Sequence, residues 1–314
     1  MSPSFDFEAA VSAPFRMQPG LRKLAPGARQ LTALNPTAPA FAEKLAVLSH
    51  HAGETLLCAP GFDPLPALQA LAHEATRQCS TALAVDAGGV ASVVLGWRVR
   101  WDGSLGEAGP DAHAASGACL EALPAPQRLA GLLSLSLHED FAVVDGATAT
   151  LPWMAVCLPS HWAPAEKVGR SFATVHGPVA DNATLIAANQ HLTRLVCQPQ
   201  RWERFVWNLT THPSHDQHPA RHARQPWPDE PGPAAARAHW RTEHQTFIPL
   251  PALQQAVFTI HVDVQPMALA IATPQRAAAL HAALSTMSEA VLAYRGLTTA
   301  RQPLLDWLAA RSSA

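Results

Sequence analysis

The stretch LLSLSLHEDFAVVDGATATLPWMAVCL, residues 132–158, carries the strongest β-hairpin signal of the sequence. Two apolar runs, 132–144 and 148–158, flank the dipeptide Asp145-Gly146. This dipeptide favours a tight turn between antiparallel strands. The segment therefore predicts an antiparallel sheet as the organising element of the fold.

Outside this hairpin, apolar residues recur with the periods of strands and helices. In 203–211, Phe205, Trp207 and Leu209 occupy every second position, which predicts a strand. We also predict strands at 81–85, 90–101, 245–250, 256–262 and 267–272, and helices at 38–50, 64–79, 164–176, 183–197 and 276–294, with a shorter helix around Leu304. Residues 212–236, rich in Pro and His, are expected to form a loop.

Strands in series, with helices interposed and appended, predict an α+β fold in which helices pack to one side of an antiparallel sheet. The start of the chain is rich in Pro, Ser and Gly and predicts an irregular arm over residues 1–40. One domain over 41–296 and a C-terminal helix over 297–314 complete the expected organisation.

Composition excludes several classes of protein. A net charge of −2 gives no strong field for nucleic acid. The cysteines are far apart and form no C-x-x-C pair, which argues against a disulfide framework, a zinc ribbon or an iron–sulfur cluster in this chain. The N-terminus lacks a signal-peptide pattern and no window of about 18 apolar residues exists, so we expect a cytoplasmic protein with no membrane span. Common nucleotide, hydrolase and zinc-protease motifs are also missing.

The segment PAEKVGRSFATVHGP, residues 164–178, predicts a helix that ends on a histidine. Val168, Phe172 and Val175 form an apolar stripe, His176 lies on the same stripe, and Gly177-Pro178 stops the helix. A neutral imidazole at such a position is either a satisfied core group or an axial ligand to a haem iron.

Other polar residues offer further candidates, each with a structural alternative. Arg241, Glu243 and Gln245 share one face of a strand, which is either exposed to solvent or lines a polar cavity. His161 lies in a loop that either covers the edge of a haem or is exposed at the surface. Cys157 is either a thiolate ligand or a small buried hydrophobic residue.

The sequence also contains a cluster of arginines and a run of histidines. Arg194, Arg201 and Arg204 form a small cluster that contacts either an anionic group, a partner or only solvent. A run of histidines in the 212–236 loop lacks the spacing of a closed zinc site and predicts a flexible loop; its members are His212, His215, His218 and His222.

Four segments together resemble the haem-dependent oxidative N-demethylase family. They are MQPGLR at 17–22, HED at 138–140, the block from VCLPSHW at 156–162 through EKVGR at 166–170 to VHGPV at 175–179, and the pair WN at 207–208 with RTEHQT at 241–246. The resemblance covers roughly residues 5–295. It implies a PAS-like fold over 41–296, with a five-stranded antiparallel sheet and haem b held between the sheet and flanking helices.

The same resemblance implies a haem-dependent oxidoreductase. It would oxidise a small secondary amine of the dimethylamine type to a primary amine plus formaldehyde, with O2 as co-substrate. Electrons would come from a separate reductase subunit that carries FMN and a 2Fe-2S cluster. The alternative is a non-catalytic haem-PAS sensor of gases or ligands. Ala180 and His244 depart from the family pattern, which has Pro and Arg there, so the substrate stays open.

The resemblance also gives the candidate residues specific roles. His176 becomes the expected axial ligand of the haem iron, with His161 as the next candidate. Arg241 would aim a donor at bound oxygen or hold a propionate, and Glu243 would pair with the substrate ammonium, with Gln245 on the same face. Trp207 and Asn208 point to opposite faces of their strand, so Trp207 would stack on haem or lie in the core while Asn208 makes a polar contact. Both are expected cofactor contacts.

Overall fold

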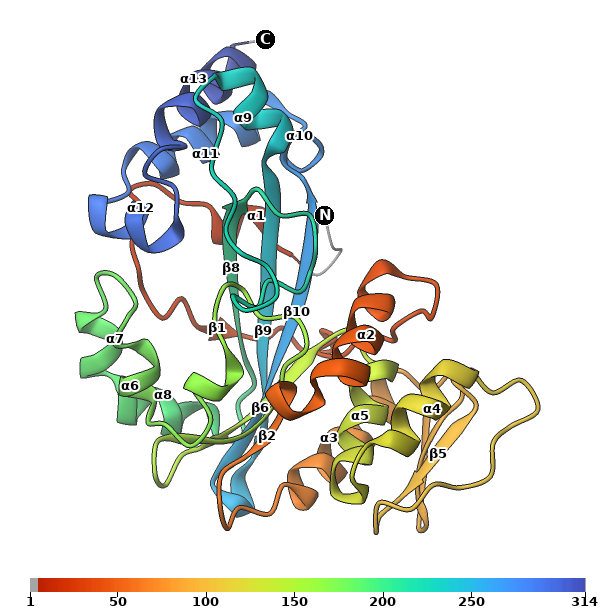
Figure 1. The fold of residues 1–314 in the computed structure, drawn as a ribbon. Coiled ribbons are helices and arrows are strands. Elements are labelled where there is room, and N and C mark those ends of the chain that lie inside the picture. Colours follow the sequence, from red (N-terminus) through yellow and green to blue (C-terminus); the bar gives the residue numbers. More distant parts are fainter. Residues whose placement is uncertain (1–4, 314) are drawn as a thin grey trace.

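The computed structural model describes residues 5–313 and is built around one seven-stranded antiparallel sheet (Figure 1). The strand order is β1-β8-β9-β10-β6-β7-β2, and a small second sheet has the order β3-β4-β5. The strands are β1 Arg22–Lys23, β2 Leu56–Cys58, β3 Leu83–Asp86, β4 Gly89–Ser92, β5 Trp97–Arg100, β6 Asp140–Asp145, β7 Thr150–Ala155, β8 Trp202–Thr210, β9 His239–Leu250 and β10 Gln255–Pro266.

Helices cover both faces of the sheet and its far end (Figure 1). They are α1 Phe7–Ala10, α2 Pro39–Thr55, α3 Leu65–Gln78, α4 Ala114–Ala122, α5 Ala125–Ser136, α6 Phe172–His176, α7 Ala183–Ala187, α8 Asn189–Val196, α9 Pro231–Arg237, α10 Met267–Ala270, α11 Pro274–Ser285, α12 Glu289–Arg295 and α13 Arg301–Ser312, with 3-10 turns at Pro164–Glu166 and Pro251–Leu253. The predicted α+β class is confirmed, although helices pack on both sides of the sheet and not on one. Among the described residues, no helix has both the length and the apolar character needed to cross a bilayer.

The hairpin predicted around Asp145-Gly146 is confirmed as β6 and β7, which pair antiparallel. Asp145 fixes the turn, because its carboxylate accepts hydrogen bonds from the amides of Ala147 and Thr148 at 3.0 and 2.8 Å. The first strand begins only at Asp140, since the chain from Ala125 to Ser136 forms α5. The leucines of this helix are buried on all sides, and a uniformly apolar run does not distinguish a strand from a buried helix.

Two other sequence predictions were wrong. The helix expected over 164–176 is a 3-10 turn and the separate short helix α6, because Gly169 adopts φ +72° and residues 169–171 pair with β7. The strand expected over 267–272 is the helix α10, in keeping with the high helix propensity of Met, Ala and Leu.

Several predicted elements are divided in the structure. The strand at 90–101 is a hairpin of β4 and β5, the helix at 183–197 is α7 and α8, and the helix at 276–294 is α11 and α12. Ser288 caps α12 by accepting a hydrogen bond from the amide of Val291, which explains the last division.

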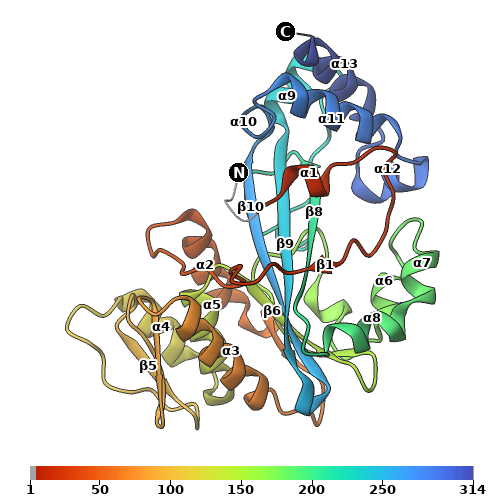
Figure 2. The same ribbon diagram turned by 180° about the vertical axis from the view of Figure 1, so that it is seen from behind.

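Five long strands, β8, β9, β10, β6 and β7, form the continuous middle of the large sheet, and the short strands β1 and β2 add to its edges. The sheet therefore has two more strands than the resemblance implied. Beyond Glu203 the outer side of β8 has no strand partner within the described residues 5–313. The N-terminal segment, from α1 through β1 to α2, crosses the back of the sheet (Figure 2).

The His138-Glu139-Asp140 motif joins the sheet to this segment and to α2. The Lys44 ammonium of α2 is fully buried and forms an ion pair with Asp140 at 3.1 Å. It also donates to the carbonyls of Leu137 and Glu139 at 3.2 and 2.7 Å. The motif thus contributes a buried polar network that supports the start of β6.

We predict that Lys44→Ala lowers the free energy of unfolding by about 3–5 kcal/mol, because it leaves the buried Asp140 carboxylate without its counter-charge. Urea denaturation measures the effect. Lys23→Ala, at an exposed position of β1, is the matched control and should cost less than about 0.5 kcal/mol. A loss below about 1 kcal/mol in Lys44→Ala would contradict this account.

Candidate functional site

Polar side chains gather on one face of the β8–β9 pair. The register places Asn208 opposite Arg241, Val206 opposite Glu243 and Arg204 opposite Gln245. Residues directly opposite each other in an antiparallel pair project to the same side of the sheet. The structure therefore brings Asn208 together with the three polar residues of β9, on what we call the site face.

Arg241 connects this face to the chain after β7 and to the loop after β8, which we call the covering segments. Only 2% of Arg241 is exposed, and β9 is an inner strand, so the alternative of a solvated edge strand is wrong. Its guanidinium donates to the Ser160 hydroxyl at 2.7 Å and to the carbonyls of Leu158 and His215 at 2.9 and 2.7 Å. Burial lowers the pKa of Arg241 to about 10, which leaves it charged at neutral pH.

Glu243 lies next in this network. Its carboxylate accepts hydrogen bonds from the Ser160 hydroxyl and, at 2.5 Å, from the side-chain amide of Gln245. Ser160 thus bridges Arg241 and Glu243. The nearby Lys167 ammonium lies 3.7 Å from the centre of the Trp162 ring and interacts electrostatically with Glu243. Lys167 thus interacts with both the Trp162 ring and the Glu243 charge, and each of these two groups attracts cations.

His176 lies at the end of α6 with a defined tautomer. Its Nδ1 atom is 2.8 Å from the carbonyl oxygen of Phe172, and a carbonyl only accepts, so Nδ1 carries the proton and Nε2 keeps its lone pair. Burial, followed by the charges of Arg204 and Lys167, lowers the pKa of His176 to about 4 against the opposing effect of the Phe172 carbonyl. The ring is therefore a neutral base at physiological pH.

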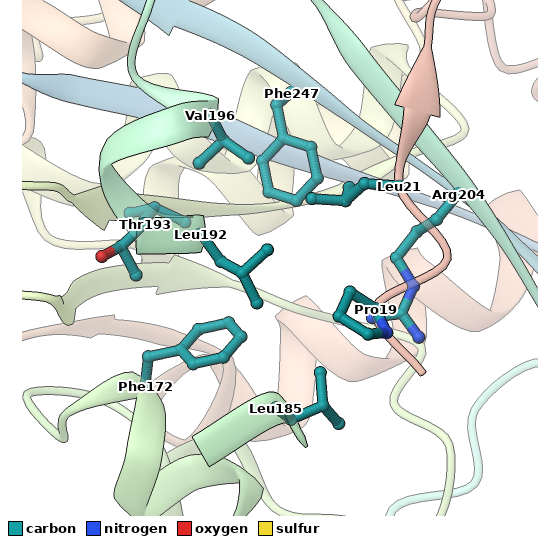
Figure 3. Close-up of a pocket in the computed structure, with 10 residues that line it drawn as sticks. Pro19, Leu21, Phe172, Leu185, Leu192, Thr193, Val196, Arg204 and Phe247 are labelled. Atoms are coloured by element: carbon teal, nitrogen blue, oxygen red, sulfur yellow. The ribbon is translucent and has the colours of Figure 1, made fainter. Parts of the chain in front are cut away.

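An apolar pocket lies beside α6 (Figure 3). Phe172 lines this pocket and packs on the His176 ring, with 4.0 Å between ring centres. The remaining walls come from β6, α7, α8, β9 and the N-terminal segment, and the space among them is about 350 Å³ with its opening to solvent included; they include Pro19, Leu21, Val144, Leu185, Leu192, Val196 and Phe247. Arg204 supplies a charge, and its Nε atom has no hydrogen-bond partner among the described residues.

His161, Trp207 and His244, which the sequence also singled out, do not line this pocket. His161 lies in the covering segment after β7. Its backbone φ is +59°, and its amide donates to the carbonyl of Gln217 at 3.0 Å. Trp207 points away from the site face and stacks on Trp240 with 5.0 Å between ring centres. His244 also points to that opposite face, where its Nε2 atom lies 2.8 Å from a carboxylate oxygen of Glu203.

Burial decides the state of Cys157. The side chain is fully buried, and burial raises the pKa of its thiol well above the usual range. A protonated thiol is a poor metal ligand, so this environment does not favour the thiolate alternative.

The basic cluster of the sequence is divided by the fold. Arg201 forms an ion pair with Glu74 of α3, Arg194 is exposed on α8, and Arg204 enters the site. The sequence indicates Arg204 only as a member of a basic cluster whose contact is an anionic group, a partner or solvent, and it gives no role to Ser160, Trp162 or Lys167. Only the tertiary fold brings Ser160 into contact with Glu243 and Lys167 within its electrostatic range.

The histidines of the 212–222 segment have separate partners. His215 Nδ1 is 3.0 Å from Glu43, and His212 packs on His222 with 4.5 Å between ring centres. Within residues 5–313, no group of three or more His, Cys, Asp or Glu side chains is arranged to hold a metal ion.

With this geometry in place, comparison with protein families identifies the chain. Residues 116–305 match the family described as haem-dependent oxidative N-demethylase, alpha subunit-like. The match covers more than half of the sequence and includes β6 to β10 and α6 to α8. The chain belongs to this family of haem-dependent oxidoreductases, whose description as an alpha subunit implies that other subunits accompany it.

We predict that acid destabilises the protein partly through His176. Its pKa is about 4 in the folded protein and about 6.5 in an unfolded chain, so between these values only the unfolded state takes up a proton. Stability attributable to this group is complete above pH 6.5 and falls by about 1.4 kcal/mol per pH unit towards pH 4.

Urea denaturation at pH 6.5 and pH 5 tests this prediction. His176→Gln should lose about 1–2 kcal/mol less than the wild type on acidification. His191→Gln, at an exposed position of α8, should lose as much as the wild type. An equal loss in all three proteins would be inconsistent with a His176 ring that stays neutral in the folded protein.

Proposed function

We propose that this protein is the haem-binding oxygenase subunit of an oxidative amine demethylase, with His176 as the axial ligand. The tautomer of His176 is the observation that carries the proposal. Histidines that bind metals usually donate their second ring N–H to a carbonyl or carboxylate, as His176 does to Phe172. The free Nε2 atom then has the lone pair that iron requires.

The surroundings fit haem b. The pocket beside His176 is apolar, which suits the faces of a macrocycle. Arg204 Nε and Asn208 Oδ1 are buried without hydrogen-bond partners among the described residues, and such atoms usually find a partner in a bound ligand or water. When bound, haem would supply the iron chemistry that activates O2 for oxidation of a methyl group.

The residues of this chain would bind and orient the amine. Glu243 would pair with the ammonium group, and Ser160 and Gln245 would hold its carboxylate in place. Arg241 positions Ser160 and, through its contacts with residues 158 and 215, keeps the covering segments closed over the strand. The aromatic face of Trp162 would stabilise the same cation, in exchange for Lys167.

The proposed reaction converts a small secondary methylamine, O2, two electrons and two protons into the primary amine, formaldehyde and water. The proposed substrate is dimethylamine-like, because a small ammonium ion would pair with the Glu243 carboxylate. Electrons would come from a separate reductase subunit with FMN and a 2Fe-2S cluster. The protein would act in the cytoplasm.

We predict that wild-type protein binds one equivalent of hemin with a Soret band, and that His176→Ala loses or shifts this band. Spectrophotometric titration measures both. His191→Ala is the control for removal of a histidine, and circular dichroism verifies folding. His161→Ala tests the other candidate, and a band that depends on His161 and not on His176 would move the ligand to the covering segment.

We further predict that Glu243→Gln weakens amine binding by about ten- to a hundredfold, because it removes the charge that faces the ammonium. Dimethylamine titrated into hemin-loaded protein, followed at the Soret band, gives the affinity. Glu166→Gln, at an exposed position of the same covering segment, should bind as the wild type does. Formaldehyde release with O2 and a reductant then separates an enzyme from a sensor, which would bind haem without turnover.

A further inference from the structure

A second pocket lies at the end of β8, and none of the roles above uses it as a site. It lies between β8, the 211–227 loop and the end of α12, with about 310 Å³ of space when its opening to solvent is included. Two arginines, two histidines and two threonines contribute to its walls, namely Arg224, Arg295, His161, His212, Thr210 and Thr211. No aspartate or glutamate is among the described residues that line it.

Arg295 is the less exposed of the two arginines of this pocket. It donates to the carbonyl of Trp207 at 2.5 Å, and its guanidinium lies 5.0 and 4.7 Å from the ring centres of Trp207 and Phe15. Burial lowers the pKa of Arg295 to about 10. Among residues 5–313, its Nε atom has no hydrogen-bond partner. Burial of such a charge is unfavourable until an anion joins it.

Arg224 and His161 complete the donor set. The Arg224 guanidinium is exposed and makes one long contact, 3.4 Å, with the carbonyl of Tyr294. Burial and the charge of Arg224 lower the pKa of His161 to about 4, so this ring is neutral and still has one N–H to donate. Guanidinium groups and a neutral N–H match the oxygens of a carboxylate.

The pocket adjoins the site face. Tyr294 interacts electrostatically with Arg204 and Glu243 of the site face and with Arg224 and Arg295 of the pocket. Arg241 also contributes to the positive field at His161. The charges of the site face and of this pocket therefore act on each other through Tyr294.

We propose that the pocket binds a carboxylate group. The inference rests on the proposed function for the source of that group, which is either a propionate of haem held at His176 or the carboxylate of a free small molecule such as an N-methyl amino acid. In both cases the negative charge of the carboxylate offsets the positive charge of Arg295.

Hemin and hemin dimethyl ester distinguish a propionate from other sources, because the ester lacks both carboxylates. If the pocket holds a propionate, Arg224→Gln weakens hemin binding by about ten- to a hundredfold and leaves ester binding unchanged. Arg29→Gln, at an exposed position away from the pocket, is the matched control. Because Arg224 is exposed, this variant is expected to fold, which circular dichroism verifies.

N-methylglycine and dimethylamine test the second source on hemin-loaded protein. If the pocket holds a free carboxylate, Arg224→Gln weakens the Soret response to N-methylglycine and leaves the response to dimethylamine unchanged. Equal behaviour of wild type and variant towards all four compounds would overturn the proposal.

Acetate titration by calorimetry keeps the two proposals separate. If wild-type protein fails to bind hemin, the proposed function fails, but acetate binding that is lost in Arg224→Gln still supports a carboxylate site. Absence of acetate binding in a protein that also shows no Arg224-dependent hemin binding would overturn the pocket alone.

Discussion

The site depends on the burial of one guanidinium. Arg241 is held inside the protein by the Ser160 hydroxyl and by two backbone carbonyls from segments far apart in the sequence. A buried cation with too few acceptors is strongly unfavourable, so these contacts act as a constraint on how the chain can close over β9. The segment after β7 and the loop after β8 must both reach Arg241, and by doing so they enclose Glu243.

The two halves of the site have different physical characters. His176 and its pocket form an apolar region in which the imidazole stays neutral because charge is poorly solvated there. The strand face with Arg241 and Glu243 is a buried hydrogen-bonded network, in which each charge has partners. A flat apolar group beside a small cation would use both regions at once, which is the chemical logic of the proposed demethylase subunit.

Local signals made part of this structure predictable. Asp145-Gly146 determines its turn through bonds to its own neighbours, and the alternation along 203–211 gives β8 almost to its limits. The helix expected at 164–176 failed because Gly169 and its neighbours pair with Leu151, a partner outside the window that a periodicity considers. Similarly, the run before His138 reads alike as a strand or a buried helix.

The site residues show the same division. The shared face of Arg241, Glu243 and Gln245 follows from strand geometry alone, and the opposite directions of Trp207 and Asn208 follow in the same way. The placement of Ser160 between Arg241 and Glu243 does not, because it requires two elements 81 residues apart to meet. Arginine is usually a surface residue, so the sequence does not indicate that Arg204 is covered. Only the fold, which places Arg204 on the site face opposite Gln245, shows this.

The anchoring of α6 has a consequence for how the proposed ligand behaves. This helix has five residues and none of them is buried, so His176 is carried by the element of the site with the least packing behind it. Local opening is favoured where few apolar contacts are lost. Part of the binding free energy of any group at His176 would therefore be spent on ordering α6 and its neighbours, which couples occupancy of the site to protection of this region from proteases. The bound cofactor would then contribute to the packing that stabilises its own site.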